Sequence, residues 1–151
     1  MKAVIQRVSR ADITINSSVN REIGAGLVVL LGVMEGDAKP QAEFLANKIA
    51  QLRIFADEND KLNRSLVDIG GDMLIVSNFT LAADCKKGKR PSFDKAAKPP
   101  LAQELYDHFV DCVRALPIGH VQTGEFGADM QVALVNDGPI TIVIDTAAIG
   151  K

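Results

Sequence analysis

The chain has 151 residues, of which 47% are hydrophobic, and its formal net charge is −2 at pH 7. This length supports one sizeable core but not two, so we expect residues 1–151 to form a single domain. The negative charge excludes a protein that coats nucleic acid over its whole surface, although it leaves room for one local basic patch.

Neither a membrane span nor a secretion signal is expected. No apolar run reaches the roughly 20 residues that a spanning helix needs, and Met1–Arg7 acquires charge before a signal peptide could form. We therefore expect a cytoplasmic protein with no membrane partner. Cys85 and Cys112 form no C-x-x-C pair and fall in a predicted basic loop and a predicted helix, which indicates two reduced thiols.

The first third of the chain predicts strands. Residues 3–8 predict one strand, and residues 12–16 predict a second with alternating polar and apolar positions. Residues 26–33 form a continuous apolar run, which is typical of a strand buried on both faces. A hairpin or meander is therefore expected to open the fold.

Two segments predict helices. The first follows a turn-like stretch at 35–40 and ends near Arg53, with an apolar stripe made of Phe44, Leu45, Ile49 and Leu52. The second begins at Pro99-Pro100, ends before Pro117, and places on one face Leu101, Leu105, Phe109, Cys112 and Leu116.

The other elements are strands. Residues 73–79, after Gly70-Gly71, predict a buried strand that carries Ser77 to Thr80 to its end. Residues 130–135 and 140–145 predict two strands joined by Asn136–Pro139. The order of strands, helix, strand, helix and strands indicates a mixed α/β domain and not an alternating Rossmann arrangement.

Six short motifs follow one another from near the start of the chain to near its end. They are Gln6–Ala11, Asn63–Leu66, Ser77–Leu81, Lys87–Phe93, Phe126–Met130 and Asn136–Thr141. In order and spacing they resemble the D-aminoacyl-tRNA deacylase family, also called D-tyrosyl-tRNA deacylases. The resemblance implies an α/β fold with mixed β-sheets in a barrel-like, layered α/β/β arrangement and two main helices.

The resemblance also implies an activity and an assembly. It implies a homodimer that hydrolyses the ester bond of D-aminoacyl-tRNA, and of glycyl-tRNA mischarged on tRNA(Ala), without a cofactor. The catalytic segment would be Ser77, Asn78, Phe79 and Thr80. Water would attack the ester with help from the terminal 2′-hydroxyl, while main-chain amides around Phe79 and Thr80 receive the oxyanion. The family's usual second residue is Gln, so Asn78 departs by one methylene and predicts an altered rate.

Thr80 also invites a different interpretation, as a nucleophile. A threonine hydroxyl is weak without an activating base, and the sequence places no base near it. His108, on the second predicted helix, and His120, in a turn, have no triad-like neighbours.

Asn136–Pro139 has an ordinary interpretation and a functional one. Asn, Asp and Gly tolerate positive φ, so the segment is typical of a hairpin turn. In the family that the chain resembles, Gly138-Pro139 is a cis dipeptide that projects into the partner subunit's active site and excludes L-amino acids sterically, and Arg7 anchors it. On the sequence alone, Arg7 is equally well a surface arginine of a strand.

Phe126, Ala128 and Met130 lie in a predicted loop that runs into a strand, where Phe126 and Met130 are ordinary core candidates. The resemblance implies a pocket for the terminal adenine, because an aromatic ring and a thioether suit a purine face. The only dense basic run contains Lys86, Lys87, Lys89 and Arg90. Such runs are usually solvated loops, but this one is also the best candidate to contact acceptor-stem phosphates.

No motif predicts a metal or cofactor site. The chain lacks H-E-x-x-H and a Walker sequence, and Gly24-Ala25-Gly26 lacks the third glycine of a dinucleotide fingerprint. Two alternatives to the deacylase stay open: a dimeric nucleic-acid-binding protein without catalytic activity, and an esterase for small acyl substrates.

Overall fold

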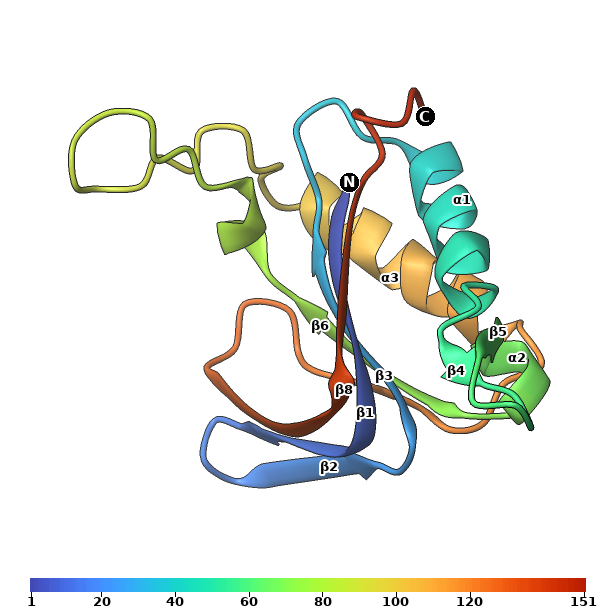
Figure 1. Ribbon diagram of the computed structural model, residues 1–151. Coiled ribbons are helices and arrows are strands. Elements are labelled where there is room, and N and C mark those ends of the chain that lie inside the picture. The colour runs from blue at the N-terminus through green and yellow to red at the C-terminus, as the bar shows by residue number, and fades with distance from the viewer.

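We describe all residues, 1–151, from a computed structural model (Figure 1). The strands are β1 (Lys2–Ile15), β2 (Val19–Ile23), β3 (Gly26–Gly32), β4 (Phe55–Ala56), β5 (Leu62–Arg64), β6 (Asp72–Ser77), β7 (Val121–Thr123) and β8 (Met130–Asp145). The helices are α1 (Lys39–Ala50), the short α2 (Leu66–Ile69), the 3₁₀ turn η1 (Phe79–Ala82) and α3 (Leu101–Arg114).

Six strands form one mixed sheet that curls toward a barrel. Its order is β2-β1-β3-β6-β7, and β8 pairs with the other edge of β1. The pairs β3–β6 and β6–β7 are parallel, whereas β1 is antiparallel to β2, β3 and β8. Strands β4 and β5 form a separate two-stranded hairpin. The predicted mixed, barrel-like α/β fold is confirmed.

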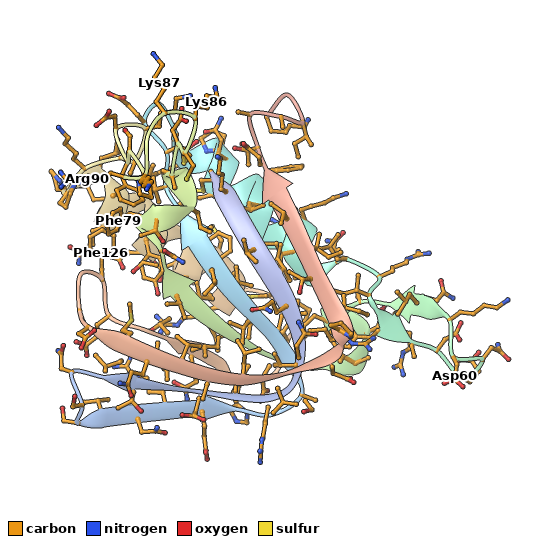
Figure 2. All side chains as sticks on the ribbon, turned by 60° about the vertical axis from the view of Figure 1, so that its left-hand side comes forward. Asp60, Phe79, Lys86, Lys87, Arg90 and Phe126 are labelled. Carbon is orange, nitrogen blue, oxygen red and sulfur yellow. The ribbon has the colours of Figure 1, made fainter.

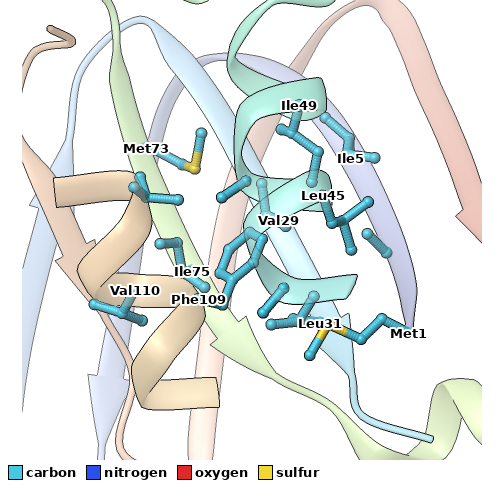
Figure 3. Close-up of a cluster of buried hydrophobic side chains, with 14 of the residues drawn as sticks. Met1, Ile5, Val29, Leu31, Leu45, Ile49, Met73, Ile75, Phe109 and Val110 are labelled. Carbon is cyan, nitrogen blue, oxygen red and sulfur yellow. The ribbon is translucent and has the colours of Figure 1, made fainter. Parts of the chain in front are cut away.

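Two layers of core explain the α/β/β arrangement. Helices α1 and α3 lie side by side on one face of the sheet, and the larger cluster of buried side chains fills the space beneath them (Figures 1 and 3). The smaller cluster lies inside the curl of the sheet, between β1, β3, β6 and β8. Because side chains alternate along a strand, Leu27 and Val29 face the helices while Val28 faces the inner cluster. The prediction of a strand buried on both faces is therefore confirmed.

The two main helices lie where the sequence predicts them, but their buried faces differ from the prediction. Helix α1 begins at Lys39, earlier than its apolar stripe, and buries alanines together with Leu45 and Ile49. Helix α3 follows Pro100 as predicted, yet Leu101 is 41% exposed. The buried face of α3 consists of Ala102, Leu105, Tyr106, Phe109, Val110 and Val113. This stripe is wider than the predicted one because it contacts both the sheet and α1.

Two predicted pairs of strands are single long strands. Residues 3–8 and 12–15 belong to the continuous β1, which ends one residue before the predicted second strand does, and residues 130–145 belong to the continuous β8. Both halves of β8 run antiparallel to β1, from the pair Met130 and Ile15 to the pair Asp145 and Lys2. The hairpin interpretation of Asn136–Pro139 is therefore wrong, since a hairpin would reverse the chain. The segment is a bulge within one strand.

No helix of the protein is both long enough and apolar enough to cross a bilayer.

Candidate active site

The segment Ser77–Thr80 leaves the sheet at the end of β6. Strand β6 ends at Ser77, and Phe79 and Thr80 then enter the 3₁₀ turn η1, so Thr80 is not at the end of a strand as the sequence suggested. The main-chain amide of Asn78 donates to the Leu31 carbonyl oxygen at 2.8 Å, which ties the segment to the neighbouring strand β3. The segment is thus held by the sheet on one side while its tip faces outward.

Asn78 caps this turn and accepts hydrogen bonds from two donor groups of Thr80. Its side-chain oxygen accepts a hydrogen bond from the Thr80 amide at 3.2 Å and a second, short one from the Thr80 hydroxyl. Because the hydroxyl donates to an uncharged amide oxygen, it has no base to activate it as a nucleophile. The Thr80 amide is likewise engaged, which leaves the Phe79 amide as the first donor of the turn.

A cavity of about 480 Å³ opens beside the Ser77–Thr80 segment. Ser77, Asn78 and Phe79 line it, and so do Phe126, Ala128 and Met130. The two groups of predicted site residues, about 50 positions apart in the sequence, therefore share one cavity. Most of its lining is hydrophobic and its volume suits a ligand the size of a nucleoside.

Ten further residues line this cavity that the sequence analysis did not predict as site residues, and Phe93, Lys98 and Tyr106 are among them. The ring of Phe93 packs edge-on against Phe79 with centroids 5.3 Å apart, and Tyr106 lies 6.2 Å from Phe126. The Tyr106 hydroxyl donates to the Ile75 carbonyl oxygen at 2.9 Å, and burial raises the pKa of this tyrosine, so it is neutral. The apolar stripe predicted for α3 did not include Tyr106, so the sequence analysis contained no signal for this residue.

The bulge of β8 carries Gly138 and Pro139, joined by a cis peptide bond. Between the pairs of Asn136 with Val8 and Thr141 with Gln6, residues 137–140 of β8 face only Arg7 of β1. The extra residues stand out from the sheet, and both Gly138 and Pro139 are exposed.

Arg7 holds this bulge from the adjacent strand. Its Nε donates to the Asp137 carbonyl oxygen at 2.9 Å, and its Nη1 donates to the Ile54 carbonyl oxygen at 2.9 Å. The Arg7 side chain is only 13% exposed, so it is not a free surface arginine. The guanidinium thereby joins the bulge to the segment that leads into β4.

The bulge lies away from the Ser77–Thr80 segment of the same chain. Arg7 pairs with Leu27 of β3, whereas Ser77 pairs with Leu31, four residues further along that strand. Four residues of strand span about 13 Å, and β3 also intervenes between β1 and β6. Within one chain, the structure does not bring Gly138 and Pro139 to the cavity.

Neither the histidines nor the cysteines line the cavity. His108 Nε2 is 3.0 Å from Glu43 Oε1 and 3.8 Å from Cys112 Sγ, between α1 and α3. Burial raises the pKa of the Cys112 thiol, and the cysteines form no disulfide. His120 lies beside Asp72 at the start of β6, the end opposite Ser77. No three His, Cys, Asp or Glu side chains gather in a way that could hold a metal ion.

The basic residues lie on an exposed loop near the cavity, but they do not line it. Lys86, Lys87, Lys89 and Arg90 are all exposed. Figure 2 shows Lys86, Lys87 and Arg90 on the side of the molecule where Phe79 and Phe126 approach each other, while Asp60 lies on the opposite side. We call residues 86–90 the basic loop.

Comparisons with known proteins agree with the motifs. The family model described as D-Tyr-tRNA(Tyr) deacylase matches residues 4–145. A D-aminoacyl-tRNA deacylase of Pelobacter propionicus is 55% identical over 145 residues, which cover 96% of this chain and 99% of that protein. A protein of the same name from Koribacter versatilis is 56% identical over 146 residues, which cover 97% of each chain.

Solved structures show the same fold. The structure titled "c-Myc DNA Unwinding Element Binding Protein" superposes with a TM-score of 0.90 at 39% identity and covers 96% of this chain and 98% of its own. A probable eukaryotic D-amino acid tRNA deacylase superposes with a TM-score of 0.82 at 17% identity and covers 95% of this chain and 97% of its own. At that identity, the second likeness shows the fold alone. The resemblance read from the six motifs is confirmed, and the chain belongs to the D-Tyr-tRNA(Tyr) deacylase family, a family of hydrolases.

Proposed function

We propose that this protein removes D-amino acids from tRNA by hydrolysing the ester bond to the terminal adenosine, and that it works in the cytoplasm as a homodimer. The observation that carries the proposal is the shared cavity of Ser77–Phe79 and Phe126–Met130. Its apolar, partly aromatic walls suit the adenine ring. The ester carbonyl of an aminoacylated adenosine bound there would lie against the 3₁₀ turn.

In this mechanism the protein positions a water molecule and an ester, and it supplies no nucleophile of its own. An aminoacyl ester is already reactive, and one amide donor aimed at the oxyanion contributes about 2.7–4 kcal/mol in other enzymes. The Phe79 amide is the proposed donor, because Asn78 engages the Thr80 amide. The 2′-hydroxyl of the terminal adenosine assists the attack of water.

The chirality of the substrate is proposed to be sensed by the bulge of the partner subunit. The bulge is exposed, it is anchored by Arg7, and its own chain's cavity lies out of its reach. A two-fold dimer can place each bulge at the other cavity. Val135 and Val143, on either side of the bulge, are 43% and 69% exposed and supply apolar surface for such an interface.

The bulge would select by exclusion. A main-chain corner without a side chain at residue 138 can contact the substrate's α-amino group while it fills the volume that an L side chain needs. Steric exclusion does not depend on the identity of a D side chain, so many D-amino acids should be accepted. Glycine has no side chain to exclude, so glycyl-tRNA mischarged on tRNA(Ala) is also a proposed substrate.

The basic loop is proposed to contact acceptor-stem phosphates. Its four cations are exposed on the side of the cavity, in a protein whose net charge is −2. A focused cluster of this kind gives affinity for a polyanion without a basic surface elsewhere.

The decisive experiment compares D-tyrosyl-tRNA, L-tyrosyl-tRNA and glycyl-tRNA(Ala) with and without the protein. We expect faster release of D-tyrosine and glycine and an unchanged rate for L-tyrosine. An excess of free D-tyrosine ethyl ester should not compete; strong competition would favour an esterase for small acyl substrates. Binding of tRNA without release of any amino acid would favour the non-catalytic nucleic-acid-binding protein.

A further inference from the structure

The side chain of Asn136, which directly precedes the bulge, forms hydrogen bonds with the main chain of Ile140 at the other end of the bulge. Its Oδ1 accepts a hydrogen bond from the Ile140 amide at 2.8 Å. Its Nδ2 donates to the Ile140 carbonyl oxygen at 3.3 Å and to the Thr141 hydroxyl at 3.1 Å. One side-chain amide therefore engages both main-chain polar groups of the same residue across the bulge.

This pairing replaces the ladder that the bulge interrupts. The register with β1 passes from Asn136 to Thr141, so Ile140 has no Cα partner on β1. A side-chain amide carries one acceptor and two donors, as a main-chain peptide carries an acceptor and a donor. The Asn136 amide thus acts toward Ile140 as a neighbouring strand would, and it fixes the distance between the two ends of the bulge.

Arg7 and Asn136 hold different parts of the bulge. Arg7 binds the Asp137 carbonyl oxygen, on the side where the chain enters the bulge. Asn136 binds Ile140, on the side where the chain leaves it. Gly138 and Pro139 lie between these two fixed points, which restricts the movement of the exposed tip.

We propose that Asn136 is a positioning residue for stereochemical selection: its side chain fixes the shape of the 137–140 bulge and thereby the volume denied to an L-amino acid. This inference rests on the proposed function of the bulge. Without the side-chain bridge, the bulge keeps the hydrogen bond from Arg7 to Asp137 and the pairing of its two flanks with β1, but nothing holds Ile140 to Asn136. A more mobile tip excludes an L side chain in some of its conformations and admits it in others.

The test uses the Asn136→Ala and Asn136→Asp variants of the full chain. For Asn136→Ala we expect hydrolysis of L-tyrosyl-tRNA to become measurable and the ratio of D to L rates to fall by about tenfold, since small errors of position cost one to two orders of magnitude. Asp keeps an acceptor for the Ile140 amide and should retain more of the ratio. A gain of activity toward the L substrate cannot come from partial unfolding, which lowers every rate together.

Asn20→Ala is the matched control, because Asn20 is also a strand asparagine whose amide group bonds to side chains of its sheet, Asp12 and Thr14, away from the bulge. The rate of hydrogen exchange at the Ile140 amide is measured together with the deacylation rates, and this measurement does not depend on catalytic activity. Faster exchange in Asn136→Ala together with a lower D to L ratio supports the proposal. Unchanged exchange, or an equal fall in the rates toward the D, L and glycyl substrates, overturns it. Inactivity of the unmodified protein on D-tyrosyl-tRNA would instead contradict the proposed function.

Discussion

The side-chain oxygen of Asn78 accepts hydrogen bonds from both the amide and the hydroxyl of Thr80. This relationship fixes what the two residues contribute to the turn after β6. The oxygen holds the Thr80 hydroxyl in place but is too weak a base to take its proton. Because the Thr80 amide donates to the same oxygen, that amide is not free to donate to an oxyanion. The catalytic work proposed for the segment then depends on the shape of the turn more than on any reactive side chain.

Replacement of Thr80 by alanine should leave measurable deacylase activity. The substitution removes a hydroxyl that donates to Asn78 and keeps the main-chain amides of the turn. We expect kcat for D-tyrosyl-tRNA to fall by less than about tenfold, because no bond of the reaction is formed by this hydroxyl. Complete loss of turnover with an unchanged melting temperature would restore the nucleophile interpretation.

Replacement of Asn78 by alanine should be more harmful. The variant loses the cap of η1, which for helix N-caps costs about 1 kcal/mol of stability, and it frees the turn to move relative to the cavity. Asn78→Asp keeps the acceptor oxygen toward Thr80 and should retain more activity than Asn78→Ala. Single-turnover deacylation of D-tyrosyl-tRNA measures both variants. Equal activity of Asn78→Ala and the unmodified protein would show that the cap has no part in catalysis.

The core strands and α3 could be predicted because their signals are local. The unbroken apolar run of β3 reports burial on both faces, and the proline pair before Leu101 marks the start of a helix. The bulge could not be predicted in the same way. Asn, Asp, Gly and Pro suit a hairpin and a bulge equally, and only the partner strand decides between them. Both flanks pair with β1, which is more than 100 residues away in the sequence, so no local pattern indicates this pairing.

The sequence predicted the motifs of the candidate site, but it did not predict which of their residues contact one another. Ser77 to Phe79 and Phe126 to Met130 came from the family resemblance, and no local pattern indicated that they share a cavity. Phe93 lies in a loop without periodicity, so nothing local indicated that its ring would meet Phe79. The bond between Asn78 and Thr80 requires a 3₁₀ turn, whereas the apolar run before it predicted a continuing strand.

Gly138→Ala should impair both activity and stereochemical selection. The φ of Gly138 is +143°, and a Cβ there would lie 2.8 Å from the Ile140 nitrogen and 2.9 Å from Ile140 Cγ1. The bulge must therefore change shape, at a cost of about 1–3 kcal/mol for a disfavoured backbone conformation. We expect a lower rate for D-tyrosyl-tRNA and a lower ratio of D to L rates.

Gly36→Ala is the control for Gly138→Ala. Gly36 also has a positive φ, +87°, but an added Cβ would meet nothing within 4 Å. It should lower the melting temperature through backbone strain and leave the D to L ratio unchanged. If both variants kept full selection, the shape of the bulge would not matter to the choice of substrate.

A larger side chain at Ala128 should obstruct the cavity. Ala128 lines the same cavity of about 480 Å³ as Ser77, Asn78 and Phe79. For Ala128→Leu we expect kcat/KM to fall by about tenfold or more, because overfilling a binding pocket by a few carbon atoms costs about 1–3 kcal/mol. Ala115→Leu adds the same volume at an exposed position after α3 and should be neutral. An unaffected Ala128→Leu would place substrate binding elsewhere.

The basic loop should make deacylation of tRNA sensitive to salt. If Lys87 and Lys89 contact phosphates, kcat/KM falls as salt rises, because binding releases counterions from the tRNA. The replacement of both lysines by glutamine should lower kcat/KM at low salt. It should also reduce the slope of log kcat/KM against log salt concentration by about one for each phosphate that the loop no longer neutralises. Lys61→Gln is the control, since Lys61 is exposed next to Asp60 on the opposite side of the molecule (Figure 2). A kcat/KM of the unmodified protein that stays constant from low to high salt would exclude the loop from the tRNA interface, and the acceptor stem would then have to be held by uncharged groups around the cavity.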